Sequence, residues 1–110
     1  MHNNFSLVPN LDPTDPRIPK YLKQQEERGF DDTELWNLDV TISKFVLPRL
    51  KAFKEYTLTG PVELSHDEWQ DTLQKMIDAF EQISDVTIGE NEIITLGLSL
   101  FHRYFLRLWD

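Results

Sequence analysis

The segment from Trp36 to Lys54 carries the side chains whose types and spacing best suit ligand chemistry. Trp36 and Asp39 lie three residues apart, so a helix would place the indole and the carboxylate about one turn apart. Four basic residues follow at helical spacing: Lys44, Arg49, Lys51 and Lys54. Lysine and arginine are the residues that bind phosphate groups. These six residues form the candidate site, for a nucleotide or another phosphate ligand.

Simpler interpretations of the same residues remain open. No Gly-rich phosphate-binding loop accompanies the basic residues, so they could form an ordinary solvated helix face. Asp39 stands beside apolar residues, which predicts partial burial and a partner such as Arg103 or Arg107. Instead of binding a ligand, Asp39 could form a structural ion pair or could simply be exposed to solvent. A stripe of acidic residues on the helix expected after residue 65 could face the basic helix face, or could mimic a nucleic acid.

Patterns for catalysis or metal binding are not evident. The chain has no cysteine, which excludes thiol catalysis, disulfides and Cys-based zinc sites. His2, His66 and His102 are far apart in sequence, so no pair has the spacing of a helical zinc site. No serine stands in a G-x-S-x-G motif. We therefore expect no catalytic residue, no cofactor and no metal site.

Apolar residues at three- and four-residue steps predict the elements that hold these side chains. Long helices are expected over about 33–56, 66–83 and 91–108, with a short one over 20–28. Asp31 with Glu34, and Ser65 with Glu68, have the spacing of capping boxes. Pro48 predicts a kink or break near 43–47. The fold class is all-α: a compact helical bundle of three long helices, plus a short N-terminal helix and a proline-rich extended arm.

The two ends of the chain suggest self-association. Residues 1–19 contain four prolines and form the expected arm, and residues 20–110 form a single helical domain. The last helix is apolar nearly all round, which predicts either the centre of the bundle or an oligomer interface. We expect a homodimer, with an interface that includes Phe5, Leu7, Phe101, Phe105 and Trp109.

The net charge limits the classes of partner that the chain is expected to bind. The 110 residues carry a formal charge of −8, which disfavours a general nucleic-acid binder and an anionic membrane surface. The N-terminus lacks the basic and apolar regions of a signal peptide, and no uncharged stretch approaches the length of a membrane span. We expect a cytoplasmic protein whose partner is another protein.

Three segments together resemble a known group of proteins. They read RGFDDTELWNLDVTISKFVLPRLKAFKE (28–55), LSHDEWQDTLQKMIDAFE (64–81) and LGLSLFHRYFLRLWD (96–110). They are similar to small proteins of bacteriophage and metagenomic virus genomes, whose function is largely unknown. Many members have E-G-L-x-L-F in the third segment, where this chain has LGLSLF and lacks the Glu. The resemblance implies a phage-type origin and a helical domain, and it implies no activity.

These observations predict a small acidic accessory protein of phage type. It is expected to be non-catalytic and to act through protein–protein contacts in the infected cell, on a host factor or a defence system. The alternative is a nucleotide- or phosphate-binding module, or an enzyme, that uses the basic residues after Trp36.

Overall fold

Helices account for all the regular structure in the described part of the chain. The computed structural model describes residues 5–86, 89 and 91–109. Within them no strand occurs, which confirms the all-α prediction. The α-helices are α1 (Ile18–Arg28), α2 (Leu38–Tyr56), α3 (His66–Ser84) and α4 (Glu92–Tyr104). Short 3-10 helices are η1 (Val8–Asn10), η2 (Asp32–Leu35) and η3 (Phe105–Arg107).

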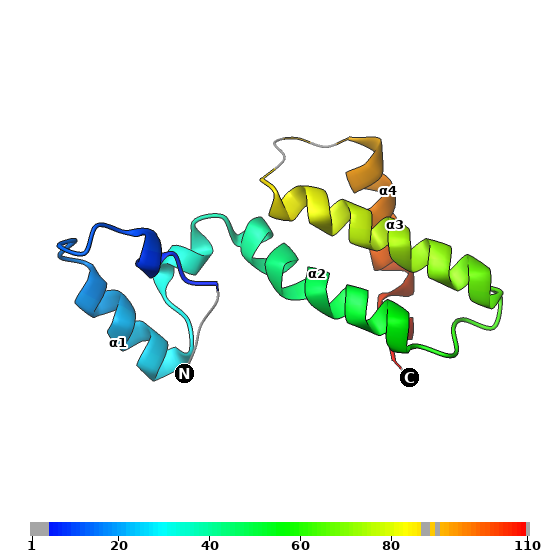
Figure 1. Cartoon of the computed structure of the whole chain (residues 1–110), viewed down its shortest axis with the longest axis horizontal. Coiled ribbons are helices and arrows are strands. Elements are labelled where there is room, and N and C mark those ends of the chain that lie inside the picture. The colour runs from blue at the N-terminus through cyan, green and yellow to red at the C-terminus, as the bar shows by residue number, and fades with distance from the viewer. Residues whose placement is uncertain (1–4, 87–88, 90, 110) are drawn as a thin grey trace.

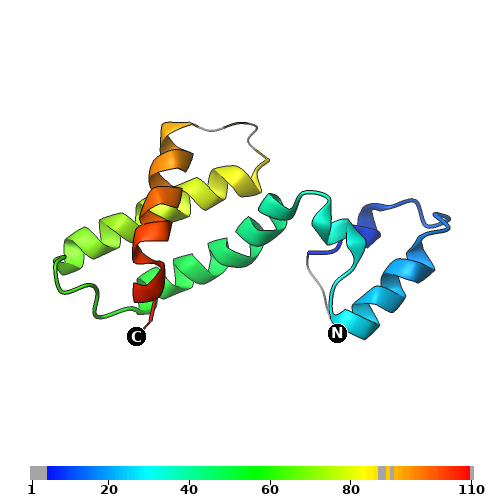
Figure 2. The same cartoon turned by 180° about the vertical axis from the view of Figure 1, so that it is seen from behind.

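The chain forms an elongated molecule with two parts (Figure 1). Helices α2 and α3 run antiparallel, and α4 crosses α3, with its carboxyl end near the end of α2 (Figures 1 and 2). Residues 5–36, here called the N-terminal unit, lie beyond the start of α2. The radius of gyration is 17.0 Å, whereas a compact chain of this length would have about 13 Å. The chain as a whole is therefore not the compact bundle that we expected.

Helix α3 is the centre of the three-helix part. Its apolar residues at steps of three and four are buried: Trp69, Leu73, Met76, Ile77, Ala79 and Phe80. The Ser65–Glu68 capping box begins this helix as predicted. Gly97 of α4 lies directly against Ala79, so the two backbones approach closely. Both α2 and α4 pack on α3, so α3 positions the other two helices.

Helix α4 differs from the sequence prediction. It ends at Tyr104 and continues as a 3-10 turn, so the expected helix over 91–108 is shorter. Among its residues only Ile94, Gly97 and Tyr104 are buried. The alternative that this helix forms the centre of the bundle was therefore wrong, because α3 occupies that position. The apolar residues Ile93, Leu96 and Leu98 of α4 are exposed instead.

The predicted helix over 33–56 is two elements. Asp31 caps η2 with a complete capping box, and α2 begins only at Leu38 after a turn. Helix α2 runs without interruption through Pro48, so the expected break is absent. Proline removes the hydrogen bond to the carbonyl four residues earlier, that of Lys44. Both residues are exposed, so water can hydrate that carbonyl and the helix continues.

The N-terminal arm is folded onto α1 and η2. The Ser6 hydroxyl donates to Asp31, and the Leu7 N–H donates to the Thr33 hydroxyl over 2.9 Å. Residues 8–10 form η1, so the arm is not extended throughout. Helix α1 begins at Ile18, two residues before the predicted start, because proline is tolerated in a first helical turn. His2 lies outside the described residues.

Candidate functional site

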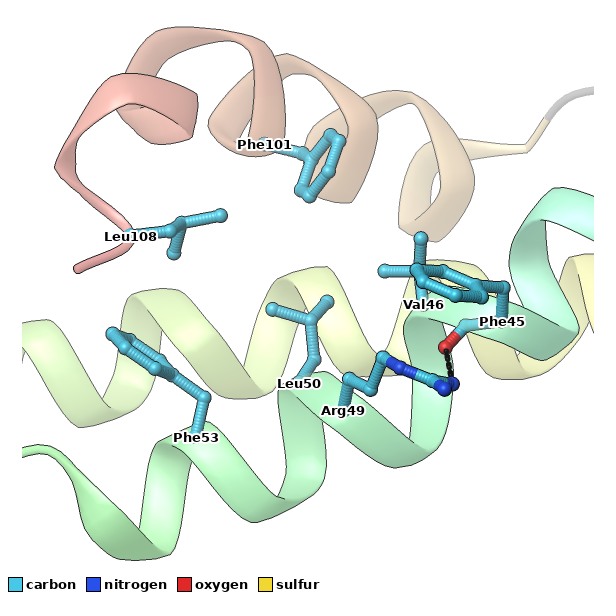
Figure 3. A pocket seen from close by; sticks show the side chains of 7 residues that line it. All are labelled: Phe45, Val46, Arg49, Leu50, Phe53, Phe101 and Leu108. Atoms are coloured by element: carbon cyan, nitrogen blue, oxygen red, sulfur yellow. Dashed lines mark hydrogen bonds between the residues drawn. The ribbon is translucent and has the colours of Figure 1, made fainter.

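An apolar groove opens between α2 and the carboxyl end of α4 (Figure 3). Its volume is about 240 Å³. Helix α2 provides one wall, and α4 with the residue after η3 provides the other. The lining residues are Phe45, Val46, Arg49, Leu50, Phe53, Phe101 and Leu108. Apart from the Arg49 guanidinium, these side chains are aliphatic or aromatic, so the groove suits an apolar side chain rather than a polar ligand.

The packing around α3 keeps this groove open. Leu50 is buried against α3, while Val46 and Phe53 are only partly buried beside it. On the other wall the Phe101 ring packs edge-on against Phe80, with 4.9 Å between ring centroids. Each wall is thus held by the core. A partner could use the groove without large rearrangement, because its walls are already in place.

Arg49 is bound to its own helix. Its guanidinium carbon lies 3.8 Å from the centroid of the Phe45 ring, and Nη1 donates to the Phe45 carbonyl over 2.9 Å. The cation–π contact and the hydrogen bond hold the guanidinium, which keeps its positive charge, over the Phe45 ring. Arg49 therefore forms part of the groove wall, with Nη1 bonded to the Phe45 carbonyl.

Three of the residues predicted at an interface lie around this groove. The Phe5 ring contacts Phe45 at 6.1 Å between centroids, and Phe105 contacts Phe101 at 5.3 Å. Phe45 and Phe101 stand on opposite walls (Figure 3). The tertiary structure thus brings together aromatic residues from the arm, from α2 and from α4. Trp109 lies elsewhere, largely exposed beside Gly60 and Pro61.

An exposed apolar stripe leads along α2 into the groove. Leu38, Ile42 and Phe45, called the α2 stripe below, are 48%, 50% and 48% exposed. The sequence places them on the core face of the helix, and this was wrong. Helix α4 approaches α2 only near the carboxyl end of α2. The first half of α2 therefore has no helix packed over the face that carries the α2 stripe (Figures 1 and 2).

The six residues of the predicted ligand site are spread along the molecule. Trp36 belongs to the N-terminal unit, where its ring packs against Tyr21 and lies 5.6 Å from the guanidinium carbon of Arg17. Asp39 is exposed at the start of α2, which agrees with the alternative of plain exposure and not with partial burial. Asp39 and Lys54 are fifteen residues apart on one helix, which is roughly 22 Å.

Only one of the predicted basic residues belongs to the groove. Arg49 lines it, while Lys44 and Lys51 are exposed on α2. Lys54 is partly buried, and its carbonyl accepts a hydrogen bond from Gln70. A small ligand could not contact both ends of this row of residues.

Asp31, which the sequence predicts to be a helix cap, is the most fully buried acid of the segment, and Glu34 is also buried. Its carboxylate accepts hydrogen bonds from Ser6 Oγ at 2.5 Å, Gln25 Nε2 at 2.6 Å and the Thr33 N–H at 2.8 Å. Burial raises the pKa of Asp31, but the hydrogen bonds from Ser6, Thr33 and Gln25 together hold it below the ordinary value. Asp31 joins the arm, α1 and η2, so its role is to hold the N-terminal unit together.

The geometry offers no metal cluster and no membrane span within the described residues. Across 5–86, 89 and 91–109, no three His, Cys, Asp or Glu side chains gather as a metal site. None of the described helices combines the length and apolar character that crossing a bilayer requires.

Comparison with known proteins gave no match. A scan against protein-family models found none that fits the chain, and searches of curated proteins and of solved structures found no similar protein. The groove and the α2 stripe are therefore the features of the molecule that bear on its function.

Proposed function

We propose that this chain is a non-catalytic accessory protein of phage type that acts through protein–protein contacts. The observation that carries the proposal is the apolar groove between α2 and α4, which continues into the exposed α2 stripe. Exposed apolar patches of this kind mark places where proteins meet. The groove walls offer no carboxylate, imidazole or hydroxyl for acid–base chemistry, and the guanidinium of Arg49 is held by Phe45.

As a phage-type protein, the chain would meet its counterpart in the infected cell, as a host factor or a defence system. The experiment is a capture from host lysate with three baits: the wild-type chain, Phe45→Glu and Ser99→Glu. Phe45 and Ser99 are both exposed helical residues, and both changes add one negative charge. We expect one protein retained by the wild type and Ser99→Glu baits and lost with Phe45→Glu. Retention by all three baits would contradict a role for the groove.

The nucleotide alternative has its own test. A thermal-shift panel of nucleotides and divalent metal ions should leave the melting temperature unchanged. A large shift with one nucleotide that disappears in the Lys51→Glu, Lys54→Glu double variant would overturn the non-catalytic, protein-binding proposal and favour the phosphate site.

A further inference from the structure

We infer that the α2 stripe and the groove form the interface of a twofold-symmetric homodimer, so that a second copy of this chain occupies them. This inference rests on the proposed function and adds a first step to it: the surface joins two copies of the chain, and the host protein would bind the assembled dimer. Four observations support it: the surface that the chain as a whole exposes, the charge of the α2 stripe and the groove, the residue spacing of the stripe, and the placement of the N-terminal unit.

The chain exposes more surface than a compact monomer of its mass. Its accessible surface is 7729 Å² for 13.0 kDa. A compact monomeric protein of this mass exposes about 6,300 Å². The excess is about 1,400 Å², and a standard interface buries about 800 Å² per partner. The excess, which belongs to the chain as a whole, is larger than the area that each partner of a standard interface buries.

The charge of the surface favours a second copy over a basic partner. The chain carries 19 acidic residues and a formal charge of −8. Two copies repel each other unless their contact face lacks acids. The α2 stripe and the groove walls contain no Asp or Glu, and their one charge is the Arg49 guanidinium. A basic partner would instead be expected on an acidic face.

The stripe has the spacing of a helix–helix contact. Leu38, Ile42 and Phe45 follow at steps of four and three, which is the pattern of a seam between packed helices. In a twofold interface the same residues meet from both copies. Ile42 is the middle residue of the stripe, so two α2 helices that cross in antiparallel directions would bring the two Ile42 side chains together at the axis.

This crossing also covers the groove. Apart from Phe5, which reaches back to Phe45, the N-terminal unit lies beyond the start of α2, and the groove extends from Phe45 towards the opposite end of the helix (Figures 1 and 3). With α2 reversed in the partner, each N-terminal unit extends over the groove of the other copy. That unit exposes about half of each of the side chains of Leu22, Leu35 and Trp36. Two chains would then complete the compact bundle that one chain does not form.

The mass in solution tests the dimer directly. Sedimentation equilibrium of the wild type should give twice the 13.0 kDa chain mass. Ile42→Glu places a charge at the axis and should raise the dimer dissociation constant by about 30-fold or more. Ser99→Glu makes the same change of charge on an exposed α4 position and should remain dimeric. A monomeric wild type, or an undiminished Ile42→Glu dimer, would overturn the inference.

A cross-link checks the axis without disturbing the fold. The chain has no cysteine, so Ile42→Cys and Ser99→Cys each introduce a single thiol. Mild oxidation should join the Ile42→Cys variant into a covalent dimer, because a disulfide forms where the two Cα atoms lie within about 7 Å. Ser99→Cys should stay monomeric on a denaturing gel. Equal yields from both variants would refute this interface.

The two proposals fail in different ways. A monomeric chain that still loses its lysate partner on Phe45→Glu would refute the dimer and keep the protein-binding function. A dimer that shows a large nucleotide-dependent thermal shift would keep the interface and refute the non-catalytic proposal.

Discussion

Ser6 donates a hydrogen bond of 2.5 Å to the buried carboxylate of Asp31, across 25 positions of the chain. The same carboxylate oxygen accepts from Gln25 of α1. This one acid therefore connects the arm, α1 and η2, and it positions Phe5 next to Phe45 at the groove. The contacts of Asp31 lead to two predictions, and the packing of α4 and α2 leads to two more.

Asp31→Ala should destabilise the N-terminal unit. It removes a helix cap and leaves the donors of Ser6 and Gln25 without their acceptor, at a cost of about 2–3 kcal/mol. Urea denaturation followed by tryptophan fluorescence measures the loss, since Trp36 lies in this unit. Asp39→Ala removes an exposed acid and should change stability by no more than about 0.5 kcal/mol. Equal losses in both variants would contradict the assignment of Asp31 as the structural acid.

Acid should weaken the same unit. The pKa of Asp31 in the folded chain lies below its ordinary value of 3.8, despite the opposing effect of burial, because hydrogen bonds stabilise the charged form. A depressed pKa contributes stability that is complete above the unfolded value and is lost as pH falls through the folded one. We expect the wild type to lose stability below about pH 4. Asp31→Asn should be less stable at pH 7 and show a flatter acid limb. An unchanged acid limb would exclude this carboxylate as its source.

Gly97→Ala should weaken the contact between α3 and α4. A Cβ at this position would collide with the Ala79 side chain and lie 2.5 Å from the Lys75 carbonyl oxygen. Neither neighbour is the flexible end of a long side chain, so the helices must separate, at a cost of about 1–3 kcal/mol. The melting temperature should fall, whereas Ser99→Ala on the same helix should leave it nearly unchanged. A Gly97→Ala chain as stable as the wild type would disprove the close approach.

Pro48→Ala should stabilise α2. The helix is continuous through this residue, so alanine restores an N–H donor to the Lys44 carbonyl without changing the path of the backbone. Helix propensity then favours the variant by about 1–3 kcal/mol. Urea denaturation measures the gain. A loss of stability would mean that the proline ring makes packing contacts that outweigh the missing hydrogen bond.

The helices could be predicted from local sequence because their signals are local. The steps of Trp69, Leu73 and Met76 indicated a buried helix face, and the Ser65–Glu68 box indicated where that helix begins. Gly29 ends α1 in the left-handed conformation, with φ of 83°, as a glycine after a helix predicts. These features depend on hydrogen bonds and on side chains within a few residues of each other.

Whether a side chain is buried depends on contacts with distant segments, which the local sequence pattern does not contain. Leu38, Ile42 and Phe45 have the spacing of a core face, yet they are exposed because α4 reaches α2 only near its other end. Asp31 and Asp39 both stand near the start of a helix, and only the return of Ser6 makes Asp31 the buried one. The sequence by itself therefore determined the helix type and the caps. The tertiary structure alone decided which apolar faces are covered, because covering a face requires an element distant in the chain.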